Sequence, residues 1–187
     1  MERERIVNDT QSQTESLLEI VRSIEKQTIM LPEFQRDFRW ELDQTYDLFD
    51  SLIREIFIGT LIYGKPSFGM TVRELDTRPR KGKGSMTKLH TYSYSADEMK
   101  IKAQTQNFRI VLDGQQRITS IYRAIVGFDT VYIMLHEALV DQDVDTIRQL
   151  SLEEMVQHVA GEESSSAISV KLSDAYDTEK TCSKKMT

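Results

Sequence analysis

The stretch that decides the fold reads Val111-Leu112-Asp113-Gly114-Gln115-Gln116-Arg117-Ile118-Thr119. It joins an apolar, β-prone segment that begins at Phe108 to a segment whose apolar residues recur at helical spacing (Ile118, Ile121, Tyr122 and Ile125). We therefore expect a strand, a tight turn and a helix start with almost no linker between them. Such a turn presents free backbone N–H groups and the positive end of the helix dipole, which favours an anion such as phosphate.

Arg117 strengthens the argument for an anion at this turn. A cation in the first turn of a helix opposes the helix dipole at a cost of about 0.3–1 kcal/mol, and a phosphate beside it would offset that cost. Asp113 could hold a metal ion, accept a hydrogen bond or pair with Arg117. A plainer interpretation stays open: Asp113 is the N-cap, Gly114 provides the turn geometry and Arg117 is solvated.

Length and composition limit the class of protein. The 187 residues suffice for one core with a loose extension, and 39% hydrophobic with 29% charged residues is typical of a soluble globular protein. No apolar run approaches the roughly 18 residues that span a bilayer, and the first ten residues lack the apolar core of a signal peptide. The single cysteine, Cys182, excludes an internal disulfide and fits a reducing compartment. We therefore expect a cytoplasmic protein with no membrane partner.

The net charge of −6 hides a segregation of charges along the chain. Residues 73–102 hold eight Lys and Arg against four Asp and Glu, whereas residues 129–163 hold nine acidic residues against one basic residue. A general coat of positive charge for nucleic acid is therefore not expected. Two interpretations of the basic stretch remain open, a solvated loop and a local DNA contact through Arg78, Arg80, Lys81 and Lys83.

The periodicity predicts an α+β domain with a small mixed sheet flanked by helices. Helices are expected over 14–27, 43–57 and 114–126, and strands over 28–31, 60–63, 107–112 and 130–135. The polar, weakly patterned residues 67–106 are interpreted as an insertion between core strands, with β structure near 89–94 and 99–103. The chain is thus divided into a core (1–135) and an acidic helical extension (136–187), helical from about 137 to 159.

Three motifs give the chain a family resemblance. Phe34-Gln35-Arg36 with Trp40, then Ile58-Gly59-Thr60-Leu61-Ile62-Tyr63, then the Asp113–Thr119 run follow one another in the order seen in the N-terminal domain of GmrSD-type restriction enzymes. That family is similar in fold to ParB and sulfiredoxin, and the resemblance covers roughly residues 14–135. It implies a ParB/sulfiredoxin-like fold with a phosphate-binding turn at the Asp113–Thr119 run. Sulfinic-acid reduction is not expected, because Gln115 and Gln116 stand where sulfiredoxin chemistry needs a cysteine.

The resemblance also implies a function. It points to a domain that binds and hydrolyses a nucleoside triphosphate and regulates an anti-phage system that restricts modified or foreign DNA. Family members usually carry an HNH nuclease domain, which this sequence lacks, so nuclease activity would reside in a further domain or a partner subunit. The chain stops where the family's second, helical region begins, as a truncated sequence would. The alternative is a non-enzymatic DNA-binding or sensing module, and the oligomeric state, a homo-oligomer included, is left open.

The predicted site residues follow from both arguments. Gln115 and Gln116 would orient a water against a phosphorus atom, Asp113 would hold Mg²⁺ together with the oxygens of the nucleotide, and Arg117 would neutralise charge. These four residues form the predicted catalytic set. The predicted nucleotide-binding set comprises Gln35, Arg36, Gly114, Arg117 and Thr119.

The aromatic residues of the first motif are interpreted as structural. Phe34 and Phe38 are expected to pack into the core, with Arg39 beside them at the surface. Trp40 is expected to anchor the chain rather than to stack on a base, because it directly precedes a predicted helix cap.

Overall fold

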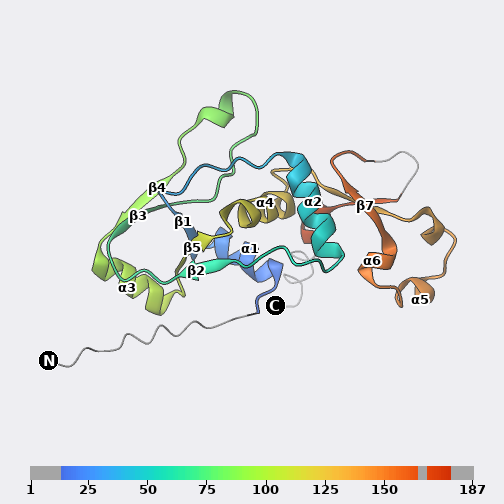
Figure 1. The fold of residues 1–187 in the computed structure, drawn as a ribbon, viewed down its shortest axis with the longest axis horizontal. Helices are drawn as coiled ribbons and strands as arrows, with labels where there is room; N and C mark the ends of the chain where they lie inside the picture. The colour runs from blue at the N-terminus through green and yellow to red at the C-terminus, as the bar shows by residue number, and fades with distance from the viewer. Residues whose placement is uncertain (1–13, 164–167, 178–187) are drawn as a thin grey trace.

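The computed structural model describes residues 14–163 and 168–177 (Figure 1). Its larger sheet has five strands in the order β2-β5-β1-β3-β4. β1 and β5 run parallel, whereas the other neighbouring strands are antiparallel, so the sheet is mixed as predicted. Cys182 and the end of the expected extension lie outside the described residues. The strands are β1 (Ile29–Pro32), β2 (Ile62–Gly64), β3 (Met70–Arg73), β4 (Thr91–Tyr94) and β5 (Arg109–Asp113).

Helices cover both faces of this sheet. α1 (Leu17–Glu25) and α4 (Gln115–Val126) pack on one face, where Ile29 and Leu31 of β1 meet Ile118. α3 (Ala96–Thr105) packs on the other face, where Met30 meets Met99. The two faces alternate along β1 because successive side chains of a strand point in opposite directions. α2 (Leu42–Ile53) packs against α4 in a further apolar cluster that contains Leu48, Phe49, Ile121 and Ile125.

A second sheet corrects the expected helical extension. β6 (Tyr132–Leu135) lies between β7 (Val156–Ala160) and β8 (Ser169–Lys171), and β7 contacts α2. Residues 137–159 are therefore not a helical region: they hold the short η2 (Glu137–Leu139), α5 (Val144–Ile147) and α6 (Leu152–Met155), then most of β7. Caps at Asp143 and Ser151 start the short helices, but burial of Val156 and pairing with β6 favour the strand.

The polar stretch 67–106 also differs from its prediction. It supplies β3 and β4, which complete one edge of the main sheet, together with the 3₁₀ turn η1 (Lys83–Met86). The β structure expected at 99–103 is wrong, because Ser95 caps α3 there and Glu98 completes a capping box. The expected burial of Phe34 is also wrong, since its side chain is 81% exposed.

The remaining helix starts lie close to their predicted places. α1 begins after Ser16, which forms a capping box with Glu19. α2 begins after Glu41, whose backbone N–H is bound by the side chain of Gln44. None of the helices in the described ranges has the length and apolar character needed to cross a membrane.

Candidate functional site

A single residue, Gly114, connects β5 to α4. Its backbone adopts a left-handed conformation (φ 89°, ψ 14°), and a Cβ at this position would overlap the side chain of Leu61. The left-handed backbone strongly favours glycine, and the contact with Leu61 adds to that preference. The first hydrogen bond inside α4 runs from the N–H of Ile118 to the carbonyl of Gly114 (3.0 Å), so the N–H groups of residues 115–117 precede the helical ladder. The strand, the turn and the helix start lie where the sequence predicts them.

A pocket of about 310 Å³ opens at this bend. Its volume is near the lower end of the roughly 300–1,000 Å³ typical of small-molecule sites. A bend filled by other side chains would leave no room for the predicted phosphate. The pocket provides that room. Two distant motifs contribute to its lining: Gln35, Arg36 and Trp40 from the first, and Leu112, Asp113, Gly114, Gln115, Gln116 and Arg117 from the second.

Gln116 attaches α4 to the loop of residues 33–40 that follows β1 (the 33–40 loop). Its Oε1 accepts hydrogen bonds from the backbone N–H groups of Arg39 (2.8 Å) and Trp40 (3.2 Å), and its Nε2 donates to the carbonyl of Asp37 (3.1 Å). Gln115 adds one more link, from its Nε2 to the carbonyl of Arg36 (2.6 Å). The two glutamines therefore hold the wall that carries the first motif.

Arg73, on β3, supports the same loop and was missed by the sequence reasoning. Its Nη2 donates to the carbonyls of Gln35 (3.0 Å) and Arg36 (2.7 Å), and its Nη1 lies 3.3 Å from the carboxylate of Asp37. The side chain is almost fully buried. A charged residue at the end of the strand Met70-Thr71-Val72-Arg73 is a signal that could have identified it, because a charge in such a place needs buried partners.

Arg117 is shared between the pocket and the loop after α2. Its Nη1 donates to the carbonyl of Ile58 (2.6 Å), and its Nη2 lies 3.4 Å from Asp113 Oδ2. Gly59 has φ 90°, and a Cβ there would overlap the Arg117 guanidinium. The Ile58-Gly59 motif therefore makes room for Arg117. The Arg117 side chain keeps 17% of its surface exposed and lines the pocket.

Asp113 and Arg36 offer the exposed charges of the pocket. The Asp113 side chain is 65% exposed. Within residues 14–163 and 168–177, no three His, Cys, Asp or Glu side chains gather in positions that could hold a metal ion. A single carboxylate still fits the predicted Mg²⁺, because this ion commonly takes one or two carboxylates and completes its shell with phosphate oxygens and water. Arg36 is exposed at the other wall.

Two residues of the predicted nucleotide-binding set, Thr119 and Gln35, differ in their relation to the pocket. Thr119 is fully buried and does not line the pocket, so the structure gives no support to its predicted role. Gln35 lines the pocket, but its Nε2 donates to the carbonyls of Val111 (2.7 Å) and Leu112 (3.2 Å). Its buried Oε1 has no hydrogen-bond partner among the described residues. Gln35 thus ties the 33–40 loop to β5.

Two arginines of the proposed DNA contact are held in ion pairs. Arg80 binds Asp129 through Nε (2.9 Å) and Nη2 (2.7 Å), and Nη1 also donates to the carbonyl of Trp40. The buried Arg123 binds the same carboxylate from the other side (2.8 and 2.9 Å). Burial of Asp129 opposes its ionisation, but hydrogen bonds from Arg123 and Arg80 outweigh it and lower the pKa of Asp129.

Arg78 is engaged in the same way with Asp76 (2.6 Å between Nη2 and Oδ2). Burial again opposes ionisation, and the hydrogen bonds from Arg78 outweigh it, so the pKa of Asp76 is also lowered. Lys81 is exposed, and the side chain of Lys83 lies outside the described part of the structure. DNA binding by this stretch stays a prediction, and Arg78 and Arg80 already donate hydrogen bonds to carboxylates and carbonyls of the protein itself.

Comparison with known proteins identifies the family. The model of the family described as GmrSD restriction endonuclease, N-terminal domain, matches residues 17–186. The chain is also similar to an uncharacterized protein of Methanocaldococcus jannaschii, with 31% identity over 118 residues. That match covers 60% of this chain and 17% of the relative, so the chain spans only a small part of that protein's length. The resemblance seen in the motifs is thereby confirmed, and the chain belongs to the GmrSD restriction endonuclease N-terminal domain family.

Proposed function

We propose that this domain binds and hydrolyses a nucleoside triphosphate in the cytoplasm. The turnover would regulate restriction of modified or foreign DNA by a nuclease in a further domain or a partner subunit. The observation that carries the proposal is the pocket at the start of α4, where the positive helix end meets Arg36 and Arg117. Family membership supports the restriction context.

Binding would rest on three sets of donors around the bend. The N–H groups of the first turn of α4 suit phosphate oxygens, and the helix dipole favours the negative charge. The Arg117 guanidinium, already fixed by the carbonyl of Ile58, would reach an oxygen without first losing much freedom. Arg36, on the opposite wall, would contact the same group from the other side.

Hydrolysis would assign different roles to the two glutamines. In the described ranges no residue donates a hydrogen bond to Gln115 Oε1, so this oxygen can accept one from an attacking water while Nε2 holds the carbonyl of Arg36. The water oxygen would bond to the terminal phosphorus, the bond to the bridging oxygen would break, and the proton of the water would pass to a phosphate oxygen. Gln116 has both ends of its amide engaged and would act as a positioning residue. Bound Mg²⁺, held by Asp113, would neutralise phosphate charge.

The test compares two arginines of the same loop. Phosphate release from ATP, GTP, CTP and UTP is measured with Mg²⁺, and the affinity for each nucleotide is measured by calorimetry. Arg36→Ala should weaken binding about tenfold or more, because a charge-assisted hydrogen bond is worth roughly 1.5–3 kcal/mol. Arg39→Ala is the matched control, since Arg39 is exposed on the same loop but does not line the pocket. Absence of binding of all four nucleotides, or equal effects of the two variants, would refute the proposal.

A further inference from the structure

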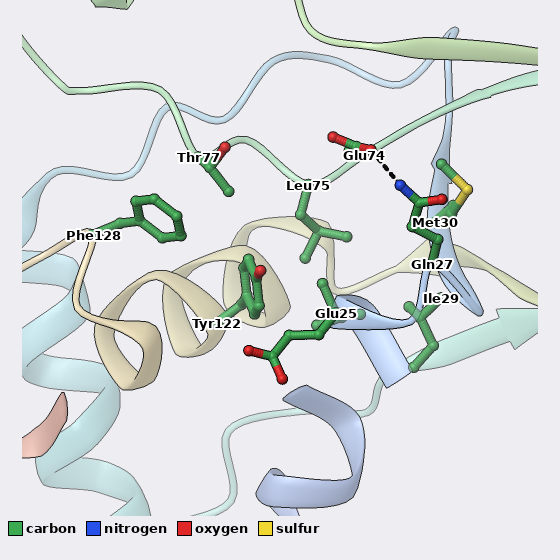
Figure 2. Close-up of a pocket in the computed structure, with 10 residues that line it drawn as sticks. Glu25, Gln27, Ile29, Met30, Glu74, Leu75, Thr77, Tyr122 and Phe128 are labelled. Carbon is green, nitrogen blue, oxygen red and sulfur yellow. Dashed lines mark hydrogen bonds between the residues drawn. The ribbon is translucent and has the colours of Figure 1, made fainter. Parts of the chain in front are cut away.

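A second pocket, of about 270 Å³, lies where α1 and α4 end (Figure 2). It shares no lining residue with the pocket at the start of α4. Glu25, the last residue of α1, and Phe128, just beyond the end of α4, form parts of its wall. The other lining residues are Ile24, Gln27, Ile29, Met30, Glu74, Leu75, Thr77 and Tyr122.

The electrostatics of this pocket favour a cation. Glu74 and Glu25 contribute carboxylates, of which Glu25 already accepts a hydrogen bond from the Tyr176 hydroxyl (3.0 Å), and none of the ten lining residues is Lys, Arg or His. The carboxyl ends of α1 and α4 also lie at the pocket, and each helix end carries roughly half a negative charge. The cations near these helix ends, Arg22 and Lys26 at the end of α1 and Arg123 on α4, do not line the pocket, and Arg123 is buried and bound to Asp129. The negative charge that faces the pocket therefore comes mainly from Glu74 and the two helix ends.

Glu74 is held in one orientation by two donors. Its Oε1 accepts hydrogen bonds from Gln27 Nε2 (2.6 Å) and from the Tyr92 hydroxyl (2.7 Å). Its Oε2 accepts none from the residues that the structure describes, and Figure 2 shows this oxygen turned away from Gln27. An acceptor that is fixed before a ligand arrives loses little freedom on binding.

The remaining wall is apolar and aromatic. The ring centroids of Tyr122 and Phe128 lie 6.2 Å apart, and Figure 2 shows Tyr122 between Leu75 and Glu25, with Phe128 nearer to Thr77. Aromatic faces attract organic cations, and buried aliphatic side chains accommodate methylene groups. A divalent metal ion would instead need a larger set of oxygen ligands, and no group of three such side chains is found in the described ranges.

We propose that this pocket binds an organic cation, namely a guanidinium or primary ammonium group on a short aliphatic chain. The charged group would bind Glu74 Oε2, and the aliphatic chain would lie against Tyr122 and Phe128. The cation would come from a free small molecule or from a side chain of another protein. The inference does not depend on nucleotide hydrolysis, because the two pockets share no residue.

The test uses the full chain without nucleotide and three probes: putrescine, agmatine and the uncharged analogue 1,4-butanediol. Calorimetry should show putrescine and agmatine binding with a Kd on the order of 1 mM or tighter, and no binding of the diol. Glu74→Gln should weaken binding about tenfold or more, and Tyr122→Leu about threefold. Glu163→Gln, an exposed carboxylate outside the pocket, should leave the affinity unchanged.

Three results would overturn the proposal: equal binding of the diol, no saturation by either cation at about 10 mM, or full affinity in Glu74→Gln. The comparison of diamine with diol needs no variant, so it holds even if a substitution disturbs folding. A blocked arginine tripeptide distinguishes the sources: tighter binding than agmatine indicates a protein side chain, and weaker binding indicates a free small molecule.

Discussion

Replacing Gln116 by alanine should loosen the 33–40 loop and lower the free energy of unfolding. The variant loses three hydrogen bonds, to the backbone of Asp37, Arg39 and Trp40. Each is worth about 0.5–1.5 kcal/mol, which gives a loss of roughly 2–4 kcal/mol. Gln115→Ala is a matched control, because the same atoms are removed from a residue with nearly the same exposure (8% against 6%) and only one bond is lost.

Urea unfolding of both variants isolates the two additional hydrogen bonds of Gln116. Because the cavity contributions largely cancel, we expect Gln116→Ala to be less stable than Gln115→Ala by about 1–3 kcal/mol. In a chain of this size that difference lowers Tm by roughly 2–4 °C per kcal/mol. Equal stability of the two variants, or a greater loss in Gln115→Ala, would show that the side chain of Gln116 does not hold the loop.

Three further predictions concern other parts of the molecule. Gly59→Ala should destabilise the protein by about 1–3 kcal/mol more than Gly82→Ala in urea unfolding. Both residues have φ 90°, but the new Cβ would displace the Arg117 guanidinium from the Ile58 carbonyl at the first and meets open space at the second. Because the pKa values of Asp76 and Asp129 are lowered in the folded state, their ionised forms stabilise the fold above the unfolded value of 3.8, and this contribution should be lost as pH falls below it. Asp129→Asn should therefore lower Tm at pH 7 and flatten its acid dependence, and an unchanged acid limb in thermal melts would count against the buried pairs. If Arg78, Arg80, Lys81 and Lys83 contact DNA, the affinity for DNA should fall steeply as the salt concentration rises. Arg80→Ala should weaken binding and change the slope of log affinity against log salt by no more than about one unit. An affinity that does not depend on salt would argue against phosphate contacts.

The local parts of the fold were predictable because their signals lie within one segment. Apolar spacing identified α4, and the acid–glycine pair before it identified the turn. The same stretch predicted the place of the pocket at Gly114, since a strand that runs straight into a helix leaves the first N–H groups of the helix without intrahelical partners. These inferences need no knowledge of the rest of the chain.

The long-range contacts could not be predicted in this way. Nothing near Gln116 in the sequence indicates that its amide binds residues 37–40, and nothing near Arg73 indicates the carbonyls of Gln35 and Arg36. The sequence predicts helix where β7 forms, because the pairing of β7 with β6 exists only in the folded chain. The ion pair of Arg80 with Asp129 likewise joins residues that are 49 positions apart in the sequence.

The position of β5 has a consequence for how the pocket can adapt. β5 lies between β2 and β1: β2 pairs with it as far as Asp113, and beyond the pairing with β1 the carbonyls of Val111 and Leu112 accept hydrogen bonds from Gln35. The opposite wall is the 33–40 loop, which is held by hydrogen bonds from the side chains of Gln115, Gln116 and Arg73. One side of the cavity is thus main chain held in the sheet, and the other is a loop held by side chains. We therefore expect the loop to move more readily than the sheet when a ligand of unusual shape binds.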